Sequence, residues 1–150
     1  MLACRHQGFN FFVCDLEIEV EDMLTNLICV GAGSCLGGMF RYLVGKWVGE
    51  CTGDGFPWPT LAVNLAGCLL LGVLYAMLER GMQMTPALRL FLTVGFCGGF
   101  TTFSTFANES VTLLMSGQQI LAGVAYVIVS LIGGFACLIL GGWHGRLPMI

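Results

Sequence analysis

The sequence predicts an all-α integral membrane protein with four transmembrane helices, the third of them broken in the middle of the membrane. Of the 150 residues, 57% are hydrophobic and only 10% are charged, whereas a soluble domain carries about 25% charged residues. The apolar residues also fall into four long runs, which form helices in lipid because the backbone must be satisfied there. This composition excludes a soluble enzyme. It also excludes a nucleic-acid-binding protein, which would be basic, because the net charge is −3.

Three of the four runs have the length of one membrane crossing. The first spans about Leu24–Val44, the second Thr60–Leu78 and the fourth Ile120–Gly142. A hydrocarbon core of about 30 Å needs about 20 helical residues, so each run fits one helix. Short connections separate the runs, and we expect Pro57 and Pro59 to lie outside the helices.

The third run, Thr85–Met115, is too long for one straight crossing. As a continuous helix it would measure about 46 Å, and glycines 95, 98 and 99 lie near its middle. Because a glycine pair is a place to break a helix, we expect two half-helices, Thr85–Phe96 and Thr102–Met115, joined by an unwound segment. Such breaks form ion sites from exposed carbonyls. A kinked, tilted helix is the alternative.

The first 22 residues are set apart by their charge. They contain five acidic residues that lie outside every apolar run: Asp15, Glu17, Glu19, Glu21 and Asp22. We expect residues 1–22 to be an extension that is disordered or not essential, and residues 23–150 to form the four-helix membrane domain. A peripheral helix over Phe11–Val20 is the alternative.

The basic residues near the span ends give almost no preference for one orientation in the membrane. Apart from the extension, Arg80, Arg89 and Arg146 would lie on the side of both termini, and Arg41 and Lys46 on the other side. A difference of one residue gives the positive-inside rule little to act on. We therefore expect that the chain can insert both ways, which permits an antiparallel, dual-topology homodimer.

Polar side chains inside the apolar runs are the candidate functional residues. Tyr126, Ser130 and Gly134 recur at four-residue steps and share a helical face, while Asn64 lies within the second run. A further group follows the glycines of the third run: Thr101, Thr102, Ser104, Thr105, Asn108, Glu109 and Ser110. Each hydroxyl alone is typical of helix packing. Together they offer donors to a small anion that must lose its water without meeting fixed positive charge.

Phe103, Phe106 and Glu109 are spaced three residues apart and should be neighbours on one helix. An aromatic ring has a positive edge that can contact an anion weakly, although phenylalanine in a membrane helix more often faces lipid or core. Glu109 is the only acid deep in a run, and an ionisable group there is a functional hypothesis by default. An ordinary interface residue near the span end is the alternative.

Two other patterns are better explained by packing. None of the eight cysteines forms a C-x-x-C pair, so we predict neither a disulfide framework nor a zinc site, and interpret cysteine as a small apolar residue. Gly33 and Gly37 form a G-x-x-x-G pair, which lets two helices approach closely. They do not form a dinucleotide-binding loop, because the spacing differs and no strand precedes them.

Three segments resemble the Fluc (CrcB) family of fluoride channels. G-F-C-G-G-F-T-T-F-S-T-F, from Gly95 to Phe106, is similar to the third-helix signature of that family. P-T-L-A-V-N-L-A-G, from Pro59, resembles its second helix, and G-G-M-F-R-Y, from Gly37, its first. The three motifs occur in the family's order, and the resemblance covers about residues 23–143.

The resemblance implies a passive, fluoride-specific channel rather than an enzyme. It implies an antiparallel homodimer with two pores in the cell (inner) membrane, and no nucleic acid or other protein partner. Phe103 and Phe106 would be ring-edge contacts with fluoride, and Arg41 would attract anions in a vestibule. Gly98 and Thr101 would give backbone carbonyls to a structural sodium ion at the dimer interface. The remaining pore residues implied are Asn64, Thr102, Glu109, Tyr126 and Ser130.

Gly134 departs from the family pattern, because the fourth-helix track can carry a serine there, and residues 1–22 are a second departure. A small multidrug-type, proton-coupled antiporter is the competing interpretation, since it also has four spans and dual topology. That mechanism needs an acid in the first span, and Leu24–Val44 contains none. A membrane thiol oxidoreductase would need paired cysteines. The residues therefore favour passive fluoride transport.

Overall fold

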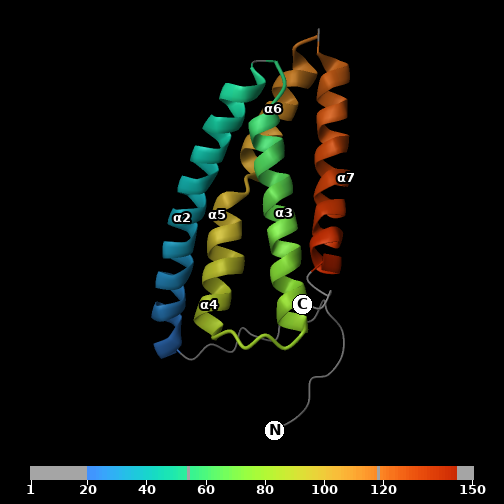
Figure 1. Ribbon diagram of the computed structural model, residues 1–150. Helices are drawn as coiled ribbons and strands as arrows, with labels where there is room; N and C mark the ends of the chain where they lie inside the picture. The colour runs from blue at the N-terminus through green and yellow to red at the C-terminus, as the bar shows by residue number, and fades with distance from the viewer. Residues whose placement is uncertain (1–19, 54, 118, 145–150) are drawn as a thin grey trace.

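The computed structural model describes residues 20–53, 55–117 and 119–144, which form helices and no strand. Four helical spans are long and apolar enough to cross a membrane: Met23–Thr52, Trp58–Glu79, Pro86–Met115 and Ile120–Trp143. The spans stand side by side and alternate in direction, so the second and the fourth run the same way (Figure 1). The predicted four-helix membrane fold is confirmed.

The first helix, α2 (Val20–Thr52), extends beyond the predicted run at both ends. Its 33 residues measure about 50 Å, more than the thickness of a hydrocarbon core. It includes the last three residues of the predicted extension, whereas residues 1–19 lie outside the described residues, together with most of the candidate helix Phe11–Val20. Exposed Trp47, near the end of α2, suits a membrane–water interface.

Helix α3 (Trp58–Glu79) begins directly after Pro57, and Pro59 is its second residue. The prediction that Pro59 lies outside the helix is therefore wrong. Proline is tolerated in a first helical turn because the N–H it lacks has no intrahelical acceptor there. The last helix, α7 (Ile120–His144), ends two residues beyond the predicted Gly142 and packs mainly against α3.

The third span is broken, as predicted, but the break lies later than predicted. Two extended residues, Thr101 and Thr102, separate the halves, whereas the first half was expected to end at Phe96. Gly98 remains helical, with φ −65° and ψ −38°. The span consists of α4 (Pro86–Leu90), the π-helix η1 (Phe91–Cys97), α5 (Gly98–Phe100) and α6 (Phe103–Met115).

Gly95 and Gly99 of the third span lie in helical segments and serve close helix packing. A Cβ at Gly95 would lie 3.0 Å from Gly33 Cα, and one at Gly99 would lie 2.8 Å from Ser34 Cα. A Cβ at Gly37 would lie 2.8 Å from the backbone nitrogen of Phe100. Two G-x-x-x-G pairs therefore face each other, and the packing role predicted for Gly33 and Gly37 is confirmed.

A second close contact joins α3 to α7. A Cβ at Gly141 would lie 3.2 Å from Gly72 Cα, and one at Gly72 would lie 3.0 Å from the backbone nitrogen of Gly142. The two parallel helices therefore touch along their backbones. This contact fixes which turn of α3 lies beside which turn of α7.

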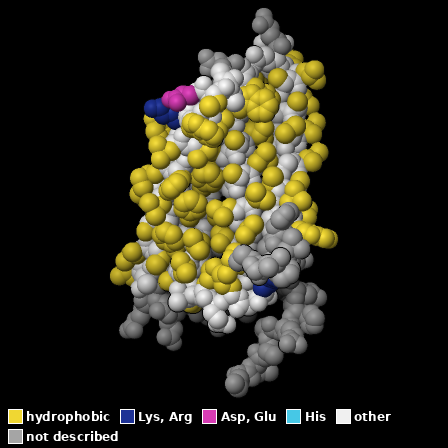
Figure 2. Space-filling view, in the orientation of Figure 1, with side chains coloured by type: hydrophobic (Ala, Val, Ile, Leu, Met, Phe, Trp, Pro, Cys, Tyr) yellow, Lys and Arg dark blue, Asp and Glu magenta, His cyan; other side chains and the backbone are white. Residues whose placement is uncertain are grey.

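The outer surface is apolar, whereas the core is small. In the view of Figure 2, hydrophobic side chains cover the flank of the bundle and charged ones lie toward its ends. The buried cluster consists of Leu61, Leu113 and Tyr126, with Phe56, Leu65 and Phe106 packed against it. Lipid or a second protein chain must cover the remaining apolar surface.

We expect Gly37→Ala to destabilise the protein by about 1–3 kcal/mol, because its methyl group would meet backbone atoms of η1 and α5. Gly38→Ala is the matched control, since a Cβ there meets nothing within 4 Å. Thermal unfolding of both variants in detergent measures the difference. Equal stability of the two variants would contradict the close packing of α2 against the third span.

Candidate functional site

Asn64 holds the break in the third span from the neighbouring helix α3. Its Nδ2 donates to the carbonyl of Thr102 at 3.1 Å, and the N–H of Thr102 donates to its Oδ1 at 2.8 Å. The amide therefore satisfies both backbone groups of one extended residue, as a strand would. One N–H of the amide is not used in this pair, so the predicted pore role of Asn64 stays a prediction.

Thr102 also starts the second half-helix. It is the N-cap of α6: the N–H of Thr105 donates to its Oγ1 at 3.4 Å, and that hydroxyl donates to Thr105 Oγ1 at 2.9 Å. A threonine in this position satisfies a donor that the helix start leaves open. The contacts of Thr102 are thus structural, because they form the break and start α6.

The break diverts the helical donors from two carbonyls. In an uninterrupted helix, the N–H groups of Thr102 and Thr105 would bond to the carbonyls of Gly98 and Thr101. Here they donate to Asn64 and to the Thr102 side chain instead. The carbonyls of Gly98 and Thr101, predicted from the family resemblance as sodium ligands, are therefore among those that the break deprives of helical partners.

Arg41 lies at the break rather than at a span end. Its Nη1 donates to the carbonyl of Thr101 at 3.4 Å, at the C-terminal end of α5. A cation is favourable there because the carbonyl ends of a helix carry partial negative charge. Arg41 therefore no longer belongs with Lys46 in the count of basic residues at the span ends, whereas Arg146 lies outside the described residues.

Glu109 joins three helices. Thr60 Oγ1 of α3 donates to Glu109 Oε1 at 2.8 Å, and the Tyr126 hydroxyl of α7 donates to Glu109 Oε2 at 2.8 Å. Glu109 is half-buried and also lines a cavity, so the alternative of an interface residue near the span end stays open. Thr60 was not among the predicted site residues, although its position four residues before Asn64 on one helical face could have identified it.

The aromatic residues form a continuous row beside this carboxylate. The ring centroids of Phe103 and Phe106 are 5.9 Å apart, and those of Phe106 and Tyr126 are 5.3 Å apart. Phe56 meets Tyr126 edge-on at 5.5 Å. The predicted pairing of Phe103 with Phe106 is confirmed. Phe103 exposes 78% of its surface, whereas Tyr126 is fully buried.

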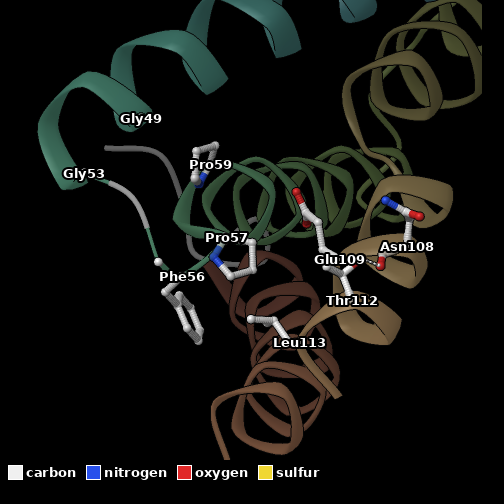
Figure 3. A pocket seen from close by; sticks show the side chains of 10 residues that line it. Gly49, Gly53, Phe56, Pro57, Pro59, Asn108, Glu109, Thr112 and Leu113 are labelled. Carbon is white, nitrogen blue, oxygen red and sulfur yellow. Dashed lines mark hydrogen bonds between the residues drawn. The ribbon is translucent and has the colours of Figure 1, made fainter. Parts of the chain in front are cut away.

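A cavity of about 540 Å³ opens at the end of the bundle beside Glu109 (Figure 3). It lies between the end of α2, the α2–α3 connection and α6, and includes the side chains of Asn108 and Thr112. Thr112 Oγ1 donates to the carbonyl of Asn108 at 2.8 Å. The residues that line the cavity are Gly49, Gly53, Gly55, Phe56, Pro57, Pro59, Asn108, Glu109, Thr112 and Leu113.

Ser130 lies one helical turn beyond Tyr126 on α7. Its hydroxyl oxygen exposes less than 1 Å² and has no hydrogen-bond partner within the described chain. A buried hydroxyl without a partner is costly. A hydrogen-bond partner for this oxygen would therefore be favourable.

Comparison with known proteins identifies the family of this chain. Residues 28–142 match the family model described as CrcB-like protein, Camphor Resistance (CrcB). The chain belongs to this CrcB family. It is 42% identical to the fluoride-specific ion channel FluC of Leptospira interrogans over 118 residues, 79% of this chain and 92% of that protein.

Two other relatives have similar coverage. The FluC protein of Chlorobium phaeobacteroides is 45% identical over 77% of this chain and 88% of its own length. That of Chloroflexus aurantiacus is 37% identical over 82% of this chain and 97% of its own length. The CrcB match begins within α2 and ends within α7, so it includes the break and Glu109. This CrcB chain is a multi-pass membrane protein with four spans.

Asn64→Ala should destabilise the protein by about 2–4 kcal/mol, because two backbone groups at the break lose their partners in a region that lipid surrounds. Asn108→Ala is the control, since that side chain lines the cavity at the end of the bundle and not the break. Thermal unfolding in detergent gives the comparison. If Asn64→Ala unfolds at the temperature of the control, the amide does not hold the break.

Proposed function

We propose that this chain is a subunit of a fluoride-specific channel that lets fluoride leave the cytoplasm passively. The observation that carries the proposal is the row of weak donors around Glu109. The hydroxyls of Thr60 and Tyr126 converge there from two helices, beside the ring of Phe106. Relatives that share 37–45% identity bear the name fluoride-specific ion channel, which supports the same substrate here.

The chemistry of the row suits a small, strongly hydrated anion. Hydroxyl donors and ring edges replace lost water, yet none of them holds the anion as a fixed positive charge would. Glu109 already occupies the hydroxyls of Thr60 and Tyr126. A fluoride ion at this level competes with the carboxylate for the same donors, so Glu109 controls passage.

A proton-coupled antiporter remains the weaker alternative. The described first span reaches Thr52 and so includes Glu50, outside the predicted run. Glu50 is exposed near the end of α2 and lies 4.0 Å from Lys46. A surface pair at a helix end has no access to the row of donors, so it does not supply the coupling acid that the alternative requires.

The channel is proposed to be an antiparallel, dual-topology homodimer in the cell inner membrane. Phe103 exposes 78% of its surface, so a single chain cannot enclose a path along the aromatic rings. A second copy would cover it and complete the path. The corrected count of basic residues gives dual insertion less support than the sequence did, so the dimer rests on Phe103 and on the family resemblance.

A structural sodium ion between the two chains is part of this proposal. Carbonyl oxygens suit a hard cation, and the Gly98 and Thr101 carbonyls have lost their helical donors at the break. Arg41 already donates to the Thr101 carbonyl, so that oxygen would be shared. The residues fit such a site, in which the ion is bound and not transported.

Efflux from proteoliposomes tests the channel proposal. We expect the wild type to release fluoride but not chloride, without need of a proton gradient. Phe106→Ile should lower fluoride efflux by about tenfold or more, because an aliphatic side chain keeps bulk but has no positive ring edge. Phe135→Ile, which removes an exposed ring on α7, is the control and should retain wild-type efflux.

Chloride release equal to fluoride release, or efflux that depends on a proton gradient, would reject the proposal. Wild-type efflux by a folded Phe106→Ile variant would reject only the role of the ring edge. Size-exclusion chromatography establishes that each variant is folded before its efflux is interpreted.

Gly98→Val tests the sodium site separately. In one chain a Cβ at Gly98 meets nothing within 4 Å, so the substitution should leave the chain folded but crowd a second chain at the break. We expect a smaller dimer fraction, and a wild-type dimer that melts at lower temperature when N-methyl-D-glucamine replaces sodium. A dimer that is equally stable in both salts would contradict the site.

A further inference from the structure

The helices α3 and α7 carry two parallel rows of polar positions. On α3, Thr60, Asn64 and the cysteine at position 68 recur at four-residue steps. On α7, Tyr126, Ser130 and Gly134 do the same. Residues four apart lie on one face of a helix, and the two helices run in the same direction (Figure 1). Successive positions of each row are therefore about one helical turn apart, and the two rows run in the same direction.

Contacts at two levels show that the rows face each other in register. At the first level, Thr60 and Tyr126 donate to the two oxygens of Glu109. Two turns further on, a Cβ at Gly134 would lie 3.6 Å from the sulfur of Cys68. The Cys68 thiol of α3 therefore lies beside Gly134, the position at which α7 has no side chain.

Between these two levels, the residues Asn64 and Ser130 favour a bound ligand. Asn64 spends one donor and one acceptor on Thr102, and the buried hydroxyl of Ser130 has no partner. An anion between the rows would give this hydroxyl the acceptor that the described chain does not supply. A ligand path that includes Ser130 and continues along both rows reaches Cys68 next.

We propose that Cys68 is the third polar contact of the anion path, and that it supplies from α3 the donor that α7 lacks at Gly134. This inference rests on the proposed fluoride transport. A thiol is a weak S–H donor on a polarizable atom. It therefore contacts a small anion without binding it tightly, and transport needs such a contact.

Four variants test this assignment by fluoride efflux from proteoliposomes. Cys68→Ala should lower efflux by about fivefold, the effect of one weak hydrogen bond, whereas Cys68→Ser keeps a donor and should conduct like the wild type. Gly134→Ser should restore efflux to the Cys68→Ala variant, because the new Cβ has room beside position 68. Gly134→Ser alone should not lower efflux.

Cys29→Ala is the matched control, since Cys29 is half-buried like Cys68 but lies on α2. It should leave efflux unchanged. Full efflux by Cys68→Ala, or a folded double variant that Gly134→Ser does not rescue, would overturn the assignment while the wild type still conducts fluoride. A wild type that does not conduct fluoride would instead overturn the proposed function, so the two failures are distinguishable.

Discussion

The structure depends on one constraint: a membrane helix that breaks must satisfy its open backbone groups without water. Asn64 meets this requirement by bonding to both the N–H and the carbonyl of Thr102. Because these bonds end one half-helix and position the next, they also set the direction of α6. The places of Phe103, Phe106 and Glu109 therefore follow from an amide on another helix.

The glycines make this arrangement possible by bringing the helices close together. Gly37 and Gly99 let α2 lie against the first half of the third span, so that Arg41 reaches the carbonyl of Thr101. Gly72 and Gly141 let α3 lie against α7. Without these contacts, the polar rows of α3 and α7 would be separated by the width of two side chains.

The sequence predicts the number of spans from hydrophobicity, and the existence of the break from the length of the third run together with its glycines. It does not place the break, since a glycine that admits a neighbouring helix looks the same as one that unwinds the chain. Gly95 and Gly99 are of the first kind, and Gly98 is helical without such a contact. Thr60 could have been found from its spacing to Asn64. The contact of Arg41 with Thr101 could not, because it joins residues 60 positions apart.

The distribution of exposure along the row of rings supports the proposal that a second chain completes the path. Tyr126 is fully buried, whereas Phe103 exposes 78% of its surface on the same row of rings. If Phe103 served only packing, its ring would be covered within its own chain. If it only faced lipid, its contact with the buried aromatic row would be unexplained. The proposed second chain would resolve both points by covering Phe103, and would leave the rest of the apolar flank to lipid.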